Sequence, residues 1–266
     1  MLLNFMVTVG VTLCCCLMVS AQQPNLEYRL IAHRGGVVNE HLIEHSLAGL
    51  QEAIVLGYWM VEIDVRETKD GLPVVHHDRD FRRYFNHSQD VADMTWDQIK
   101  LLRSSPGNHW PLLLSEFAAA CRGKMRLMVE IKGPSHNAKF YKSVERILRE
   151  NNLLDEAIMI GIPEAKAYFR GKLRTSVQRD GLVSAVEAGE DVESFHFLFR
   201  GARYLEEETI EYARTVGVPI VAAVNKHHYQ GENSMQSAKA DIRRMIELKV
   251  RTFQIDSNYE HLFQER

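Results

Sequence analysis

Cysteine is scarce in this chain of 266 residues, and three of its four cysteines are consecutive near the N-terminus, at positions 14 to 16. Apart from that stretch Cys121 stands alone, so the rest of the chain has no internal disulfide. Cys121 follows a run of alanines, and we interpret it as a small buried apolar residue rather than a nucleophile. The stability of the fold must therefore come from its core.

Excess charge of one sign is also lacking. The chain has 32 Lys and Arg against 35 Asp and Glu, a formal net charge of −3, and no basic run or stripe. We therefore expect no nucleic-acid partner, because such binding depends on clustered positive charge. A hydrophobic content of 45% in a chain of this length favours one large domain over two small ones.

No apolar run is long enough for an ordinary membrane span, which needs roughly 20 residues. The uncharged run Phe5–Val19 has fifteen, and small residues precede Gln22 as they do at a signal-peptidase site. An uncleaved N-terminal anchor and a packed N-terminal helix are the alternatives. After cleavage near Ala21-Gln22 we expect an exported protein, periplasmic or secreted, without stable membrane association. The expected segments are a signal peptide over residues 1–21, an extension over 22–29 and a catalytic domain over 30–266.

Short runs rich in Val, Ile and Phe alternate eight times with longer segments of helical periodicity. Eight β-α units in one chain of this size predict a closed (β/α)8 TIM barrel with a parallel sheet. A doubly wound sheet is the alternative, but no glycine-rich dinucleotide loop follows the first strand. The predicted strands are Leu30–His33, Met60–Val65, Arg126–Ile131, Ala157–Ile160, Leu173–Val177, Phe195–Phe199, Pro219–Val224 and Thr252–Asp256.

One segment interrupts the alternation. Asp70-Gly71 separates two apolar runs, a pattern typical of a β-hairpin. We therefore predict a hairpin and loop insertion after the second strand, with Asp78–Pro111 lying over the C-terminal face of the barrel.

Carboxylates stand at the predicted ends of two strands. Glu62 and Asp64 are two residues apart, so both side chains point to one face, and the same spacing pairs Glu130 with Lys132. Three carboxylates meeting at a barrel mouth would repel one another unless a cation joined them. Oxygen ligands alone suit Mg²⁺ or Ca²⁺ rather than zinc. A solvated strand margin is the plain alternative for each motif taken alone.

Two histidines stand in similar places, His33 beside Arg34 after the first strand and His77 after the hairpin. Taken alone, His33-Arg34 could be a surface pair, but four motifs at successive strand ends indicate one site. Neighbours on a strand face opposite ways, so His76 is expected to be packed or solvated outside that site. His227-His228 could bind a second metal, although a loop at the barrel mouth is the simpler interpretation.

These motifs, in this order, resemble the glycerophosphodiester phosphodiesterase family. The resemblance covers Leu30 to about Asn258, and it is specific in the first half and weak between Gly161 and Phe199. The segments that carry it are His33-Arg34-Gly35, Glu62-Ile63-Asp64-Val65, His77-Asp78, Glu130-Ile131-Lys132 and, less closely, Val224-Asn225 and Ile255-Asp256.

The resemblance implies metal-dependent hydrolysis of small phosphodiester substrates to glycerol-3-phosphate and an alcohol. It assigns Glu62, Asp64 and Glu130 to one divalent cation, His33 and His77 to acid–base catalysis, and Arg34 and Lys132 to the phosphate oxygens. Glu44 would orient Arg34 or a metal ligand, unless it is a carboxylate that stabilises a helix N-terminus.

The chain also departs from the family pattern. Ile43-Glu44-His45-Ser46 matches Pro-Glu-Asn-Thr imperfectly, and Ala222 stands where the seventh strand often carries a Trp. A smaller side chain would open the pocket, and Arg200 and Gln178 could supply other polar contacts.

Two further functions remain open. The first is phospholipase D-like hydrolysis of lysophospholipids, for which Tyr84, Phe85, Trp96 and Trp110 could form an apolar track. The second is a non-catalytic protein that binds phosphate esters, although binding alone has no use for a proton-transfer pair.

Overall fold

A computed structural model of the chain describes residues 28–134 and 136–263. The predicted signal peptide, residues 1–21, and most of the predicted extension, residues 22–29, lie outside these ranges. Within them, no helix combines the length and the apolar character needed to cross a membrane.

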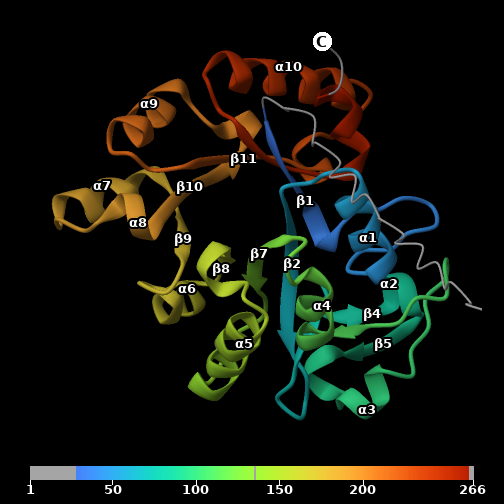
Figure 1. Cartoon of the computed structure of the whole chain (residues 1–266). Coiled ribbons are helices and arrows are strands. Elements are labelled where there is room, and N and C mark those ends of the chain that lie inside the picture. Colours follow the sequence, from blue (N-terminus) through green and yellow to red (C-terminus); the bar gives the residue numbers. More distant parts are fainter. Residues whose placement is uncertain (1–27, 135, 264–266) are drawn as a thin grey trace, which may run out of the picture.

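Eight parallel strands form a closed barrel, which confirms the predicted fold class (Figure 1). The order around the barrel is β1-β12-β11-β10-β9-β8-β7-β2, and pairing of β1 with β2, with Ile31 opposite Met60, closes it. The barrel strands are β1 Arg29–Ala32, β2 Met60–Glu67, β7 Arg126–Ile131, β8 Ile158–Gly161, β9 Arg174–Val177, β10 His196–Gly201, β11 Ile220–Val224 and β12 Thr252–Ile255.

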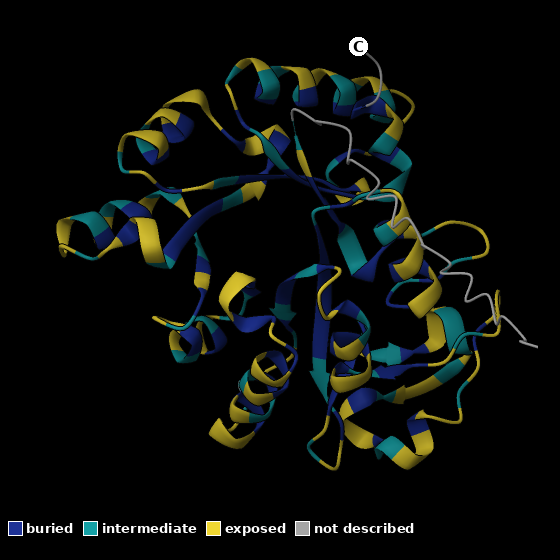
Figure 2. Ribbon diagram, in the orientation of Figure 1, coloured by how far each residue is buried: buried dark blue, intermediate teal, exposed yellow. Residues whose placement is uncertain are grey.

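Helices surround the strands and turn their buried sides inward (Figure 2). In α5, Ala138–Glu150, the buried residues Phe140, Val144 and Ile147 recur at helical spacing, and the Asn137 side chain caps the first turn. The other helices of the ring are α1 Leu47–Val55, α4 Leu114–Cys121, α6 Pro163–Phe169, α7 Arg179–Glu187, α8 Val192–Phe195, α9 Glu207–Thr215 and α10 Ser234–Glu247. Short 3-10 helices are η1 His33–Gly35, η2 Val91–Asp93, η3 Leu154–Glu156, η4 Ala202–Tyr204, η5 Lys226–His228 and η6 Ser257–Phe263.

The core has two layers. The larger lies between strands and helices and includes Cys121, which is buried as predicted. The smaller fills the barrel interior, and its residues come from alternating inward positions of the strands: Ile31, Met60, Met128, Ile158, Ile160, Phe197 and Val221.

The predicted hairpin follows the barrel part of β2. Gly71 has φ 80°, and β3, Pro73–Val75, pairs antiparallel with β2 and with β6, Leu112–Leu113. The segment between β3 and β6 contains β4 Asp80–Phe81, α2 Arg82–Phe85, β5 His87–Asp90, η2 and α3 Trp96–Ile99.

This insertion lies beside β2 and α4, so it flanks the barrel mouth and does not cover it (Figure 1). The prediction that Asp78–Pro111 lies over the C-terminal face was therefore wrong. The physical reason is a separate small core, in which Phe81, Val91, Met94 and Ile99 pack on Val74 of the sheet extension. Burial of these apolar side chains holds the insertion to the side of the barrel.

Candidate active site

The first strand ends in a tight turn that places two polar side chains at the barrel mouth. Arg34 and Gly35 have φ of 58° and 83°, and Gly36 has φ 144°. A Cβ on Gly35 would lie 2.7 Å from the backbone of His45, and one on Gly36 would lie 2.3 Å from that of Gly49. The two glycines are therefore needed for this turn.

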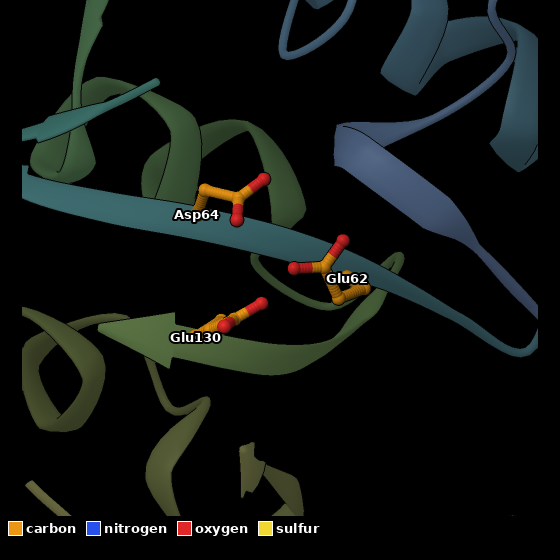
Figure 3. Close-up of side chains that lie close together, drawn as sticks. All are labelled: Glu62, Asp64 and Glu130. Carbon is orange, nitrogen blue, oxygen red and sulfur yellow. The ribbon is translucent and has the colours of Figure 1, made fainter. Parts of the chain in front are cut away.

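Three carboxylates converge beside it (Figure 3). Glu62 and Asp64 extend from β2, and Glu130 extends from β7 at the position that pairs with Asp64. One oxygen of each lies within 4.8 Å of the others, and the side chains of Glu62 and Asp64 are buried. The structure thus brings together the three residues predicted from the sequence to hold a metal.

Burial and neighbouring charges shift the pKa values of the carboxyl groups in this cluster. Burial, then repulsion from Asp64 and Glu130, raises the pKa of Glu62 well above its ordinary value. The pKa of Asp64 is lowered, because contacts with His45 and Lys132 outweigh the opposing effect of burial. Among the described residues, Oε1 of Glu62 has no hydrogen-bond partner. A buried, unpartnered oxygen in an all-oxygen donor set fits a hard divalent cation.

His33 faces this cluster with one nitrogen and a carboxylate with the other. Its Nε2 lies 3.8 Å from Glu62 Oε2, and its Nδ1 lies 2.6 Å from Asp256 Oδ1. The second oxygen of Asp256 accepts the backbone N–H of Lys226 at 2.6 Å. No role for Asp256 was predicted from the sequence, although Ile255-Asp256 is one of the segments that resemble the family, and that resemblance was the available signal.

His77 has a matching arrangement. Its Nδ1 lies 2.8 Å from Asp78 Oδ1, and its Nε2 lies 3.2 Å from Arg34 Nη2. Its backbone carbonyl accepts two hydrogen bonds from Arg66, at 3.0 and 2.6 Å. Burial raises the pKa of Asp78, but contacts with His77 and Arg83 outweigh it and lower that pKa overall. Each histidine therefore has a carboxylate on Nδ1.

Glu44 joins Arg34 to the insertion. Its Oε1 accepts from Arg34 Nη1 at 2.5 Å and from Arg83 Nη1 at 2.6 Å, and its Oε2 accepts from Arg83 Nη2 at 2.7 Å. Arg83 also donates from Nε to Asp78 at 2.7 Å. Arg83, which sequence reasoning missed, thus contacts the partners of both Arg34 and His77.

Lys132 lies on the acidic cluster. Its Nζ is 2.9 Å from Glu130 Oε2 and 3.2 Å from Asp64 Oδ1. Burial opposes its charged form, yet Asp64 and Glu130 raise its pKa, so it remains an ammonium ion beside the carboxylates.

A cavity of about 730 Å³ opens at the mouth. On one side it is lined by His33, Arg34, His77, Glu130 and Lys132. The side formed by β8, β9, β10 and α6 we call the far wall. It begins at Ile160, which pairs with Glu130 across β7 and β8, and it consists of Ile160, Ile162, Lys166, Ser176, Gln178 and Phe199. Ala223, Asn225, His227, His228 and Gln254 are among the residues that close the ring between the two sides.

The interpretation of Ala222 as the pocket residue was wrong. Ala222 packs in the layer between strands and helices, while Ala223 lines the cavity at the level of Gly201 and Gln254. Of the two proposed polar contacts, Gln178 lines the cavity, whereas Arg200 is not among the lining residues and donates from Nη1 to Gln178 Oε1.

The aromatic residues considered for an apolar track do not line the cavity either. Phe85 and Trp96 pack on the core of the insertion, Tyr84 lies beside Arg83, and Trp110 is 48% exposed.

The structure also places the three other histidines that the sequence analysis considered. His76 is buried, its Nε2 lies 2.8 Å from the Asp80 carbonyl, and its ring packs on Phe81, as expected of a residue outside the site. His227 and His228 line the cavity, but in the described part of the chain the one group of three potential metal ligands is Glu62, Asp64 and Glu130.

Comparisons with known proteins place the chain in a family. A glycerophosphodiester phosphodiesterase 1 of Homo sapiens is 28% identical over 132 residues, which cover 46% of this chain and 39% of that protein. A lysophospholipase D of Rattus norvegicus is 37% identical over 71 residues, 27% of this chain and 22% of that protein. The matches thus span less than half of the length of these two relatives.

Solved structures share the fold. An Oleispira antarctica phosphodiesterase, solved with its product sn-glycerol-3-phosphate, superposes with a TM-score of 0.69 at 16% identity, covering 89% of this chain and 97% of that one. The model of the glycerophosphoryl diester phosphodiesterase family matches residues 33–241, which is most of the chain and includes every predicted site residue. This chain therefore belongs to the glycerophosphoryl diester phosphodiesterase family.

Proposed function

We propose that this protein hydrolyses glycerophosphodiesters to glycerol-3-phosphate and an alcohol, with one divalent cation at Glu62, Asp64 and Glu130. The observation that carries the proposal is the pair of imidazoles beside that cluster, each with Nδ1 on a carboxylate. A carboxylate on Nδ1 directs Nε2 toward the reacting atoms and stabilises the imidazolium that forms when Nε2 takes a proton.

The phosphate would lie between the acidic cluster and Arg34. Arg34 and Lys132 are the cations that face this space, and both would bind non-bridging oxygens. When bound, Mg²⁺ or Ca²⁺ would add positive charge against the same oxygens and so lower the barrier to nucleophilic attack on an anion. The phosphate would also take over the Arg34 Nη2 donor that now meets His77 Nε2, which leaves Nε2 able to carry a proton.

Two proton transfers complete the reaction. His33 accepts the proton of the nucleophile through Nε2 as the new P–O bond forms. His77 donates a proton to the oxygen of the leaving alcohol as the old P–O bond breaks. The nucleophile is either water or the neighbouring hydroxyl of the glycerol, and the latter would give a cyclic phosphate that water then opens.

The test is release of glycerol-3-phosphate from a panel of water-soluble glycerophosphodiesters, with Mg²⁺, Ca²⁺ or excess chelator. We expect metal-dependent release, and a loss of about 10² to 10⁴ in kcat for His33→Ala. His41→Ala is the matched control, because the His41 side chain is 81% exposed and lies outside the cavity. Turnover that survives both the chelator and His33→Ala would contradict the proposal.

Hydrolysis of lysophospholipids is the second candidate. It is favoured by the rat lysophospholipase D relative and by the apolar side chains of Ile160, Ile162 and Phe199 in the cavity. Lysolipids belong in the same panel. Turnover of lysolipids with none of the soluble diesters would replace the first function by this one.

A further inference from the structure

The two sides of the mouth cavity carry different charges. Glu130 is the one carboxylate among the described residues that line the cavity, and it lies on the catalytic side beside Lys132. The far wall offers apolar groups, two neutral polar side chains and Lys166. Glu130 borders this wall at Ile160, and a substrate arm that extends beyond Ile160 along the wall meets the positive charge of Lys166 and no further lining carboxylate among the described residues.

Lys166 differs from the cations of the catalytic side. Its Nζ donates to the Ser176 carbonyl at 3.1 Å, and in residues 28–134 and 136–263 no carboxylate oxygen lies within 4.0 Å of it. Arg34 and Lys132, by contrast, both have carboxylate partners. Burial lowers the pKa of Lys166, which is the direction expected when no counter-ion compensates for lost hydration. An anionic group in the cavity would supply that counter-ion.

A second cation borders the same wall. Arg200, at the end of β10, is exposed and has no carboxylate partner in the described part of the chain. Its Nη1 donates to Gln178 Oε1 at 3.2 Å, and Gln178 Nε2 donates to the Phe199 carbonyl at 2.8 Å. Both the oxygen and the nitrogen of the Gln178 amide are thus hydrogen-bonded, which fixes this side chain in the wall. Arg200 also adds positive charge at the rim of the cavity.

The wall is also poorly suited to a quaternary or primary ammonium group. Such groups are typically bound by clustered aromatic faces or by carboxylates. Phe199 is the single aromatic side chain of the far wall, and Lys166 would repel a cation placed against it.

We propose that the far wall binds the alcohol portion of the substrate and selects an alcohol that carries an additional negative charge, such as a phosphorylated polyol, with Lys166 as its ionic partner. This inference rests on the proposed function, since it assigns the variable arm of a glycerophosphodiester to the cavity opposite the histidines.

The test compares kcat/KM for three substrates in the metal-loaded full-length protein. They are glycerophosphoinositol 4-phosphate, which has an anionic alcohol, glycerophosphoglycerol, which has a neutral one, and glycerophosphocholine, which has a cationic one. We expect wild type to favour the anionic substrate over the cationic one, and Lys166→Met to lower that preference about fivefold, as for a partly exposed ion pair. Lys166→Arg should retain it.

Lys124→Met is the matched control, because Lys124 is exposed just before β7, at the opposite end of the barrel strands. An equal effect of Lys166→Met on all three substrates, or an equal change in preference in Lys124→Met, would overturn the inference.

A binding measurement separates this inference from the proposed function. In chelator-treated protein, calorimetry should show that glycerophosphoinositol 4-phosphate binds more tightly than glycerophosphocholine, and that Lys166→Met narrows the difference. If no substrate is hydrolysed but this difference is present, the proposed function fails and the subsite stands. If hydrolysis is seen and neither preference nor binding changes in Lys166→Met, the subsite assignment fails alone.

Discussion

On one side of the barrel mouth, ion pairs join the side chains that follow or extend from β1, β2 and β7. On the other side, β8, β9, β10 and α6 present two isoleucines, a phenylalanine and two cations, Lys166 and Arg200, that have no carboxylate partner among the described residues. The first side includes both histidines and all three carboxylates of the proposed metal site. Each charge there is fixed by at least one neighbour. A substitution on that side should therefore disturb several groups at once, and its effects should not add to those of neighbouring substitutions.

The far wall has few such links. Its residues contact the rest of the molecule mainly through backbone and core packing, and changes there should alter which substrate binds without changing how the bond is broken. The contrast also explains why the family motifs are clear up to Glu130-Ile131-Lys132 and weak between Gly161 and Phe199. Interlocked charges restrict residue choice, while a wall with few polar links between side chains accepts more residue types.

The strongest test of this contrast is Arg83. Arg83→Ala removes the donor shared by Glu44 and Asp78, so that both Arg34 and His77 lose a fixed neighbour. We expect kcat to fall about 10- to 100-fold, as for other residues that orient catalytic groups. KM should change little. Arg83→Lys should restore only part of kcat, because it keeps the positive charge but one ammonium group cannot make the two-pronged contact of a guanidinium.

Arg82→Ala is the control for this prediction, because Asp80 is the one carboxylate partner of the neighbouring Arg82 among the described residues. The measurement is kcat and KM as functions of pH, since altered support of His77 should also shift the pH profile. Equal losses in both variants, with an unshifted profile, would show that Arg83 acts only through the stability of α2.

His76 provides a second test, because it adjoins His77 in sequence but belongs to the core of the insertion. Burial lowers its pKa from 6.5 to about 4. Between these two pH values the unfolded state binds a proton at His76 that the folded state does not bind. The free energy of unfolding is therefore unaffected by this group above pH 6.5 and decreases as the pH falls from 6.5 to about 4. Across that pH range the decrease in the free energy of unfolding that is due to His76 amounts to about 3 kcal/mol.

The corresponding measurement is denaturant unfolding at pH 7 and pH 5 for wild type, His76→Gln and His41→Gln. Wild type and His41→Gln should lose clearly more stability on acidification than His76→Gln. If all three proteins lose the same amount, the proton that destabilises the fold is taken up elsewhere.

Much of the site could be predicted from the sequence because strand periodicity and the rule for barrel strand ends apply locally. Glu62 and Asp64 share a face because they are two residues apart, and Glu130 joins them because β7 pairs with β2. The supporting contacts were missed because distant segments create them. His33 and Asp256 are 223 positions apart, and Arg83 reaches Glu44 only through the fold of the insertion.

The error at Ala222 has a different cause. The β11 sequence Ile220–Val224 contains adjacent alanines between apolar residues, so it lacks the alternation that would reveal which side chain faces inward. The register of β11 with β10 and β12 determines which of its side chains face the barrel interior, and in this register Ala223 faces the cavity.

Replacing each alanine in turn by a larger residue tests which of the two faces the cavity. It also tests whether a change in the shape of the cavity alters substrate binding without altering the reaction. Ala222→Leu would overfill a packed layer next to Phe253, so we expect a loss of about 1–3 kcal/mol in the free energy of unfolding with kcat/KM unchanged. Ala223→Leu would extend into open cavity, so stability should change by about 0.5 kcal/mol or less while KM rises. Denaturant unfolding and steady-state kinetics on the two variants provide the comparison. The opposite pattern, with a kinetic effect at Ala222 and a stability effect at Ala223, would mean that β11 turns its other face to the substrate.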